Sequence, residues 1–205
     1  MKTDLLLEVP FSEKDEAKSF GAKWNPKLKC WYVPAGLDKS NFSKWLPPDL
    51  DASSNFKAIS PIYLARSAEN CWRCGSETSV FCIAAAGFIE DDDEIEGFVT
   101  FSNLGFCEET IRNKIEAYAP LYRVAYSKQA DSHYYMNHCE HCNAKIGDFY
   151  IHNEPEGAFC PIEEARGGFV TLYELIGIPN TVTLDANPGF SEPNFIELYG
   201  KREKL

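Results

Sequence analysis

The sequence predicts an α+β protein made of a small head and a larger body. Short apolar segments surround one helical pattern in the first 48 residues, a segment rich in Pro, Ser and Asp follows at 47–55, and the remaining chain mixes strand and helix patterns. With 205 residues, of which 44% are hydrophobic and 14% aromatic, the chain is apolar enough to bury a core rather than remain disordered.

The head, residues 1–48, is predicted to have the order β-α-β-β-α. Leu5 to Leu7 and Val9 indicate a strand, and Ser12 with Asp15 forms a capping pattern for a helix over 13–20. Gly21 is expected to end that helix in a left-handed conformation. A hairpin over 23–33 and a last helical turn over 41–46 follow. Since so small a domain needs large side chains to be stable, its core is expected to use Trp24, Trp31, Tyr32, Phe42 and Trp45.

The body, residues 56–205, is predicted to alternate strands and helices. We expect a strand over 80–83, an acidic loop from Glu90 to Glu96, a helix over 108–117, strands over 122–126 and 148–152, packed segments over 170–176 and 181–184, and a frayed polar tail from about residue 200.

Two Cys-x-x-Cys pairs carry the strongest chemical signal, and they are Cys71 with Cys74 and Cys139 with Cys142. Each pair places two sulfurs on one side of a turn, where they can bind one tetrahedral zinc ion at about 2.3 Å. Gly75 and Asn143 follow the pairs, and both residue types adopt the left-handed backbone that such a turn needs. The sequence therefore predicts a four-cysteine zinc site in a zinc-ribbon-like body, with the 64 residues between the pairs as a long insertion.

Other interpretations of the cysteines remain open. A redox Cys-x-x-Cys motif needs one pair only, and cysteines also pack as small hydrophobic residues. His138 and His141 lie next to the second pair, where either can replace a cysteine as ligand. Buried thiols are expected at Cys30, Cys82, Cys107 and Cys160, and a second site from Cys160 with His152 is the weaker alternative.

The turn after the first helix interleaves lysines with aromatic residues, as in Lys23, Trp24, Lys27, Lys29 and Trp31. Such a pattern is typical of surfaces where bases of single-stranded DNA stack on rings and lysines bind phosphates. The alternative is that the rings form the core of the head and the lysines its solvated edge.

Charge is unevenly distributed. The net charge is −11, and it separates into +1 over residues 1–50 and −12 over residues 51–205. The acidic body argues against sequence-independent wrapping of nucleic acid but leaves room for a basic face on the head. The acidic run from Glu90 to Glu96 is interpreted as a solvated loop, a divalent-cation site or a phosphate mimic. No signal peptide or apolar span is evident, so we expect a cytoplasmic protein without membrane contact.

The head resembles a known family. The segments from Val9 to Lys18 and from Gly21 to Pro26, together with Trp31 to Pro34 and Trp45 to Pro47, are similar to a small bacterial domain appended to plasmid-type DNA primases, topoisomerases and mobile-element proteins. The resemblance implies a role in DNA processing. The remaining chain looks more loosely like bacterial proteins that pair this head with a cysteine-knuckle body.

Three functions compete on these grounds. The first is a non-enzymatic, zinc-stabilised binding module whose partner is a protein or single-stranded DNA. The second is an acidic inhibitor or immunity-type protein that covers a basic surface. The third is a metalloenzyme, which ranks last because four cysteines leave no open position on the metal and no nucleophile motif accompanies them. The protein is therefore expected not to be an enzyme.

Overall fold

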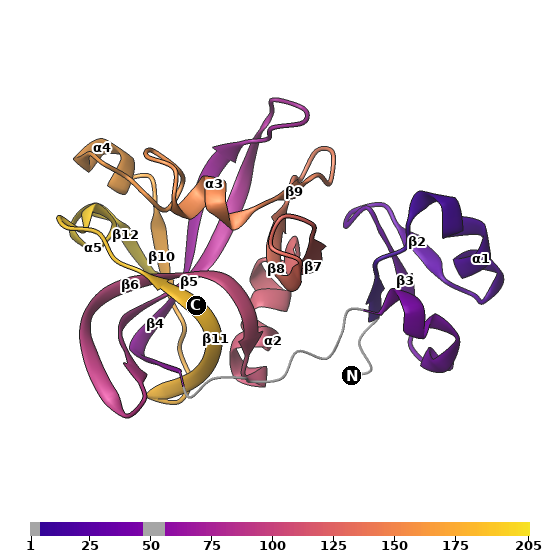
Figure 1. Ribbon diagram of the computed structural model, residues 1–205, viewed down its shortest axis with the longest axis horizontal. Coiled ribbons are helices and arrows are strands. Elements are labelled where there is room, and N and C mark those ends of the chain that lie inside the picture. The colour runs from indigo at the N-terminus through magenta and orange to yellow at the C-terminus, as the bar shows by residue number, and fades with distance from the viewer. Residues whose placement is uncertain (1–4, 47–55) are drawn as a thin grey trace. The chain divides into compact units, whose positions relative to one another are not determined.

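The computed structural model describes residues 5–46 and 56–205, so the predicted linker at 47–55 lies outside the described residues. The chain divides into two compact units, Met1–Asp49 and Leu50–Leu205, which we call the head and the body (Figure 1). Both units contain helices and strands, which confirms the α+β class. Within the described ranges, no helix is long and apolar enough to cross a membrane.

The head is a three-stranded antiparallel sheet, ordered β1-β3-β2, that shares one core with its helical segments. Leu7, Val33, Phe42 and Trp45 fill this core. The elements follow the predicted order: β1 (Leu5–Leu7), the 3-10 helix η1 (Phe11–Glu13), α1 (Lys14–Ser19), β2 (Lys23–Asn25), β3 (Cys30–Val33) and the 3-10 helix η2 (Lys39–Trp45).

The start of the first helix differs from the prediction. Ser12 lies inside η1, and α1 begins with Glu13 as its N-cap and without a side-chain cap. The Glu13 carboxylate instead accepts a hydrogen bond of 2.7 Å from the Trp45 indole N–H. The observed N-cap thus lies one residue after the predicted one, and no side chain caps it. Gly21 does adopt the left-handed conformation, with φ of +98°.

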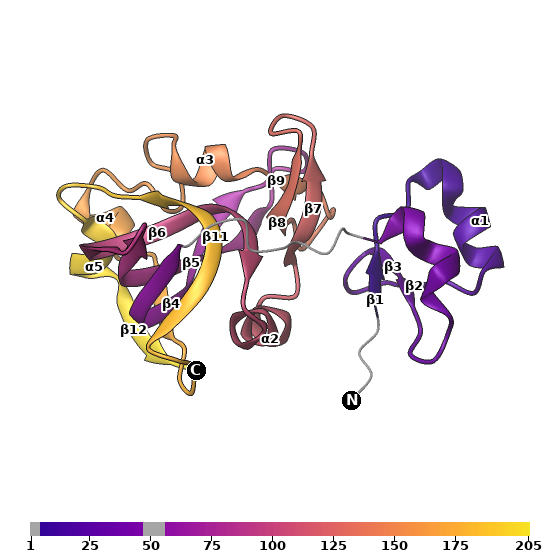
Figure 2. The same ribbon diagram turned by 60° about the horizontal axis from the view of Figure 1, so that its bottom comes forward.

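A six-stranded sheet, ordered β11-β6-β5-β4-β10-β12, forms the centre of the body. Because β11 pairs with β6 and also with β4, the sheet curls back on itself, and Figure 2 shows the strong bend of these strands. The strands are β4 (Lys57–Asn70), β5 (Glu77–Glu90), β6 (Asp93–Cys107), β10 (Thr171–Glu174), β11 (Thr181–Gly189) and β12 (Lys201–Lys204).

Both faces of this sheet are buried, which explains the continuous apolar run near the middle of β5. Ile83 and Ala85 point to one core, whereas Cys82 and Ala84 point to the other, as alternation along a strand requires. The helix α2 (Glu109–Tyr118) covers the first core with Ile111 and Ile115. The second core is covered from α3 (Asp148–His152) and α5 (Phe195–Tyr199), and α4 (Glu164–Gly167) lies next to α5.

A smaller sheet, ordered β7-β8-β9, joins the central sheet through Asn137. This sheet consists of β7 (Tyr122–Ser127), β8 (Ser132–His138) and β9 (Lys145–Ile146). The buried Asn137 amide accepts from the Phe81 N–H at 2.8 Å and donates to the Phe81 carbonyl at 2.9 Å. Because β6 pairs with β5 only from Ile83 onward, the backbone groups of Phe81 have no partner on the β6 side of β5. Asn137 satisfies these groups.

Four expectations about the body are corrected. Residues 148–152 form the helix α3 rather than a strand, and the expected frayed tail forms β12, which pairs in parallel with β10. The acidic run is not a loop but the tip of the β5–β6 hairpin, where only Asp91 and Asp92 make the turn. The residues between the cysteine pairs are not an appended insertion, because they contain β5 and β6 of the central sheet.

Candidate metal centre and neighbouring cavities

The two Cys-x-x-Cys pairs lie in two six-residue turns of matching construction. The first turn, 71–76, joins β4 to β5 where Asn70 pairs with Glu77, and the second turn, 139–144, joins β8 to β9 where His138 pairs with Lys145. We call these turns the first and second knuckle. Both knuckles connect antiparallel strands, although the strands belong to different sheets.

Corresponding backbone hydrogen bonds fold the two knuckles alike. Gly75 donates to the Cys71 carbonyl at 2.8 Å, and Asn143 donates to the Cys139 carbonyl at 2.9 Å. Gly75 has a φ of +72° and Asn143 a φ of +58°, as their residue types predicted. A second bond closes each turn, from Cys71 to Ser76 and from Cys139 to Ala144, both at 2.9 Å.

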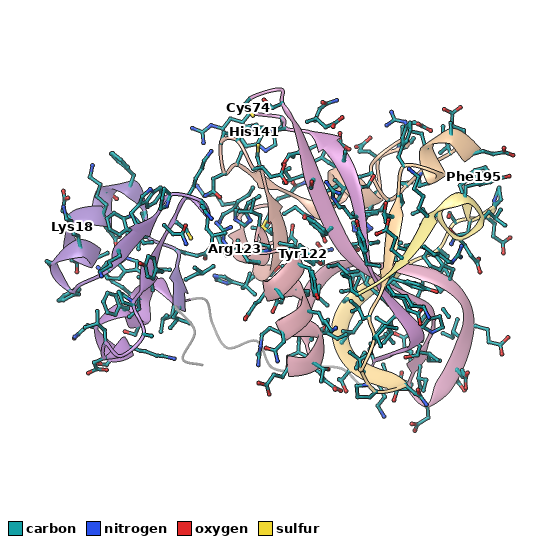
Figure 3. All side chains as sticks on the ribbon, turned by 180° about the vertical axis from the view of Figure 1, so that it is seen from behind. Lys18, Cys74, Tyr122, Arg123, His141 and Phe195 are labelled. Atoms are coloured by element: carbon teal, nitrogen blue, oxygen red, sulfur yellow. The ribbon has the colours of Figure 1, made fainter. Side chains whose placement is uncertain are left out.

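Three contacts hold the knuckles against one another. The Trp72 indole donates to the Lys145 carbonyl at 2.8 Å, and the Glu140 N–H donates to the buried Thr78 hydroxyl at 3.0 Å. The His141 Nε2 lies 3.0 Å from the Glu77 carbonyl. Figure 3 labels Cys74 and His141 at this end of the body.

The four sulfur atoms gather as the ligands of one metal ion would. Cys71, Cys74, Cys139 and Cys142 place their Sγ atoms within 4.8 Å of one another. The Sγ atoms of Cys71 and Cys142 are 3.6 Å apart, and those of Cys74 and Cys139 are 3.7 Å apart. A regular tetrahedron with metal–sulfur bonds of about 2.3 Å has edges of about 3.8 Å. The donor set therefore fits a tetrahedral metal ion, and no described cysteine forms a disulfide.

Backbone groups around the sulfurs favour thiolates unequally. The Ser76 N–H and hydroxyl lower the pKa of the Cys74 thiol to about 6. The Ala144 N–H acts in the same direction on Cys142, but burial and the neighbouring thiols raise the pKa of Cys142 to about 11. Of these two thiols, Cys74 ionises more readily before a cation is present.

Neither histidine beside the second pair joins the cluster. The Nδ1 of His138 lies 2.9 Å from the Met136 carbonyl and 3.1 Å from the Leu121 carbonyl, and burial lowers the pKa of this ring to about 3. His141 contacts Glu77 as described above. Among the described residues, the only group of three or more potential ligands is the set of four cysteines.

The lysine–aromatic turn of the head forms the β2–β3 hairpin. Trp24 and Trp31 face each other across the strands, with ring centroids 5.7 Å apart. Trp24 is 49% exposed because β2 is an edge strand, whereas Trp31 is half-buried against the core of the head. Lys23 precedes Trp24 in β2, so it points to the opposite face of the sheet. Lys27 and Lys29 lie in the connecting turn.

Two adjoining cavities lie beside α3, and no sequence pattern indicated them. The larger of the two, of about 330 Å³, is lined by residues of β6, α3 and β11 and of the segments that follow α3 and β11, and both His152 and Cys160 belong to its lining. Burial and then Glu156 raise the pKa of Cys160, so its thiol stays protonated. Among the residues that the structure describes, no other cysteine, histidine or carboxylate lines this cavity, which leaves the suggested Cys160–His152 metal site without further ligands there. A buried carboxyl, Asp148, lines a neighbouring cavity of about 190 Å³.

Comparison with known proteins identifies the head only. Residues 5–47 match the family described as “Domain of unknown function (DUF5710)”. Two proteins from Escherichia coli, both named DNA primase TraC, are 56% and 54% identical over 39 residues, which is 19% of this chain. The chain spans only 4% and 3% of the length of these relatives. The resemblance of the head to a primase-associated domain is thereby confirmed, and no solved structure matches the chain.

Proposed function

We propose, starting from the DUF5710 domain at residues 5–47, that this chain is a non-catalytic, zinc-stabilised binding protein that acts on DNA or on a DNA-processing partner. The observation that carries the zinc assignment is the tetrahedral spacing of the four sulfurs. The observation that supports the DNA context is the similarity of the head to part of DNA primase TraC. Zinc thiolates persist where thiols stay reduced, so we also propose a cytoplasmic location.

The four-cysteine site is better suited to a structural zinc ion than to a catalytic metal ion. Soft thiolates select zinc over magnesium or calcium, and four cysteine ligands complete a tetrahedral shell without an open position for water or substrate. When bound, the ion supplies a cross-link between the two knuckles. The residues of the knuckles orient the sulfurs through the Ser76 and Ala144 N–H groups.

Metal analysis of the purified chain tests the zinc assignment. We expect about one zinc ion per chain, because one set of four thiols binds one ion. Cys142→Ser should abolish zinc binding, whereas Cys160→Ser, a thiol outside the cluster, should leave the zinc content unchanged. Protein that folds normally without metal would contradict the proposal.

The surface of the head proposed for single-stranded DNA consists of Trp24 and Lys27, both exposed, with the half-buried Lys29 at the β2–β3 hairpin. Trp24→Ala should weaken binding by about 1–3 kcal/mol, the usual contribution of a stacked base. Replacing Lys27 and Lys29 together should flatten the log–log salt slope by about 1.4, at about 0.7 per phosphate contact. Lys23→Ala is the matched control, since Lys23 faces the other side of the sheet. A fluorescence titration that detects no binding at about 50 mM salt would remove the DNA surface from the proposal.

The acidic hairpin favours a second candidate, an inhibitor that covers a basic protein surface. Glu90, Asp91, Asp92, Asp93 and Glu94 are all exposed at the tip of the β5–β6 hairpin. Binding to a basic protein that is lost when Asp92 and Asp93 are changed to Asn, with no DNA binding by the head, would favour this function.

A further inference from the structure

The larger of the two cavities beside α3 has the size and composition of a small-molecule site. Its volume of about 330 Å³ lies at the lower end of the range of about 300–1,000 Å³ typical of such sites. It shares Ser102, Asn103 and Asn153 with the neighbouring cavity, so the two form adjoining hollows beside α3.

The lining of the larger cavity is polar but carries no ionised side chain. Asn103, Asn153 and Asn187 contribute amides, and no hydrogen bond joins these three side chains to another described residue. Each amide offers a donor and an acceptor side by side. The absence of lysine, arginine, aspartate and glutamate from the described lining disfavours a phosphate or a metal ion as the bound group.

His152 lines the same cavity, but its unsatisfied ring nitrogen lies inside the protein and not at the cavity surface. Its Nε2 is buried without a hydrogen-bond partner, although the residue as a whole keeps part of its surface exposed. Burial lowers the pKa of His152 to about 3, so the ring is neutral at physiological pH. The ring packs on Phe159 with centroids 5.2 Å apart and an angle of 32° between the planes.

The backbone is distorted where the two cavities meet. The pairing of β6 with β11 shifts between Asp185 and Asn187, and Asn103 has a φ of +50°, which is uncommon for a residue other than glycine. The Asn103 N–H donates to the buried Asp148 carboxyl at 2.6 Å. Bulges of this kind redirect side chains next to binding sites. The distortion thus places Asn103 in the wall that both cavities share.

We propose that the larger cavity binds a nucleobase, either of a free nucleoside or of an unpaired nucleotide in a single strand. A nucleobase is neutral, planar and edged with donors and acceptors, which the Asn amides match. Phe159 lines the cavity but is only 4% exposed, so the ring available for stacking is Phe190, which is 53% exposed and lies at the lining with its ring 5.6 Å from Phe88. This site is separate from the sulfur cluster and from the head, and it does not depend on the function of either.

Calorimetric titration of the full chain with adenosine, guanosine, cytidine and thymidine tests the site. We expect at least one nucleoside to bind. Asn153→Leu and Asn187→Leu should each weaken binding by about tenfold, since each removes an amide that pairs with the base. Asn113→Leu, at an exposed position of α2, is the matched control and should bind like the parent chain. A thermal melt verifies that the variants fold.

A second titration, with a mixed-sequence single-stranded oligonucleotide, separates the two sources of the base. Oligonucleotide binding that is weakened by Asn153→Leu but not by Trp24→Ala, without nucleoside binding, would indicate a base presented by a strand. Failure of both probes, or equal binding by the cavity variants and the Asn113→Leu control, would overturn the proposal.

Discussion

Asp148 is a buried carboxyl whose protonation couples stability to pH. Only its Oδ2 accepts a hydrogen bond, from Asn103, while its Oδ1 is buried without a partner. Burial therefore raises the pKa of Asp148 to about 7, although the Asn103 N–H opposes this. Because the folded protein binds the proton more tightly than the unfolded chain, ionisation of Asp148 should lower the free energy of unfolding as pH rises from about 4 to 7.

Asp148→Asn should remove this dependence. The amide keeps an acceptor for the Asn103 N–H but cannot ionise, so the variant should exceed the parent chain in stability at pH 8, by up to about 4 kcal/mol for a shift of about three pKa units. The gain should vanish near pH 4. Denaturant unfolding at several pH values measures it, and Asp93→Asn, at an exposed site on the hairpin, serves as the control. An equal gain at pH 4 and pH 8 would argue against a buried, titrating carboxyl.

The tryptophans of the head should divide into structural and exposed residues. Trp45 is 2% exposed and donates to Glu13, and this bond, followed by Lys44, lowers the pKa of the Glu13 carboxyl. Trp45→Ala should cost about 3–5 kcal/mol and unfold the head, whereas Trp24→Ala should cost less than half of that because Trp24 is half-exposed. Circular dichroism melts of the two variants compare the costs. Equal destabilisation would mean that Trp24 belongs to the core.

Residue types alone predicted the local backbone conformation at positions where a single residue determines it. The left-handed backbone at Gly75 and Asn143 follows from the knuckle pattern, and so does the convergence of two sulfurs in each turn. The exposure of Trp24 did not follow from its type, because it depends on which strand lies at the edge of the sheet. The order of the strands in the head sheet depends on the pairing of β1 with β3, which lie far apart in the sequence.

At the scale of single elements, the last strand should contribute to the stability of the body. Lys201 donates to the Val170 carbonyl and Leu205 donates to the Glu174 carbonyl, both at 2.9 Å, and Leu205 packs against the first core. Truncation after Gly200 should therefore lower the free energy of unfolding by about 1–3 kcal/mol, through lost hydrogen bonds and apolar contact. Lys204→Ala, which keeps the strand, is the control for lost charge. A truncated chain that unfolds at the same denaturant concentration would show that β12 contributes nothing.

Short segments were the elements that sequence patterns predicted poorly. Residues 148–152 contain aromatic and β-branched side chains that favour a strand, yet they form α3 because Ile151 packs into the second core. The tail from 201 to 204 is wholly exposed and charged, and only its pairing with β10 makes it a strand. In contrast, the amphipathic pattern of α2 is long enough to predict a helix close to its observed bounds.

For the whole molecule, we expect chelation of the metal to affect the body alone. All four candidate ligands belong to the body, and the core of the head contains none of them. Structural zinc contributes on the order of 10 kcal/mol to small sites, so a strong chelator should lower the melting temperature of the body sharply. The melting transition of the head, followed by tryptophan fluorescence in a Trp72→Phe background because Trp72 lies in the first knuckle, should not move. A simultaneous loss of both transitions would mean that the two units do not fold independently.

The placement of the knuckles on different sheets has a consequence for the order of folding. Each knuckle needs only its local hairpin, β4–β5 for the first and β8–β9 for the second, but the four-sulfur site needs both knuckles, and β6, α2 and β7 lie between these hairpins along the chain. An ion bound early by the two sulfurs of one knuckle would thus gain its other two ligands only when the chain between the knuckles closes into a loop. The entropy cost of closing that loop rises only with the logarithm of its length. Metal would then bind late in refolding. It would lower the unfolding rate of the folded body and leave the rate at which the first hairpin forms almost unchanged.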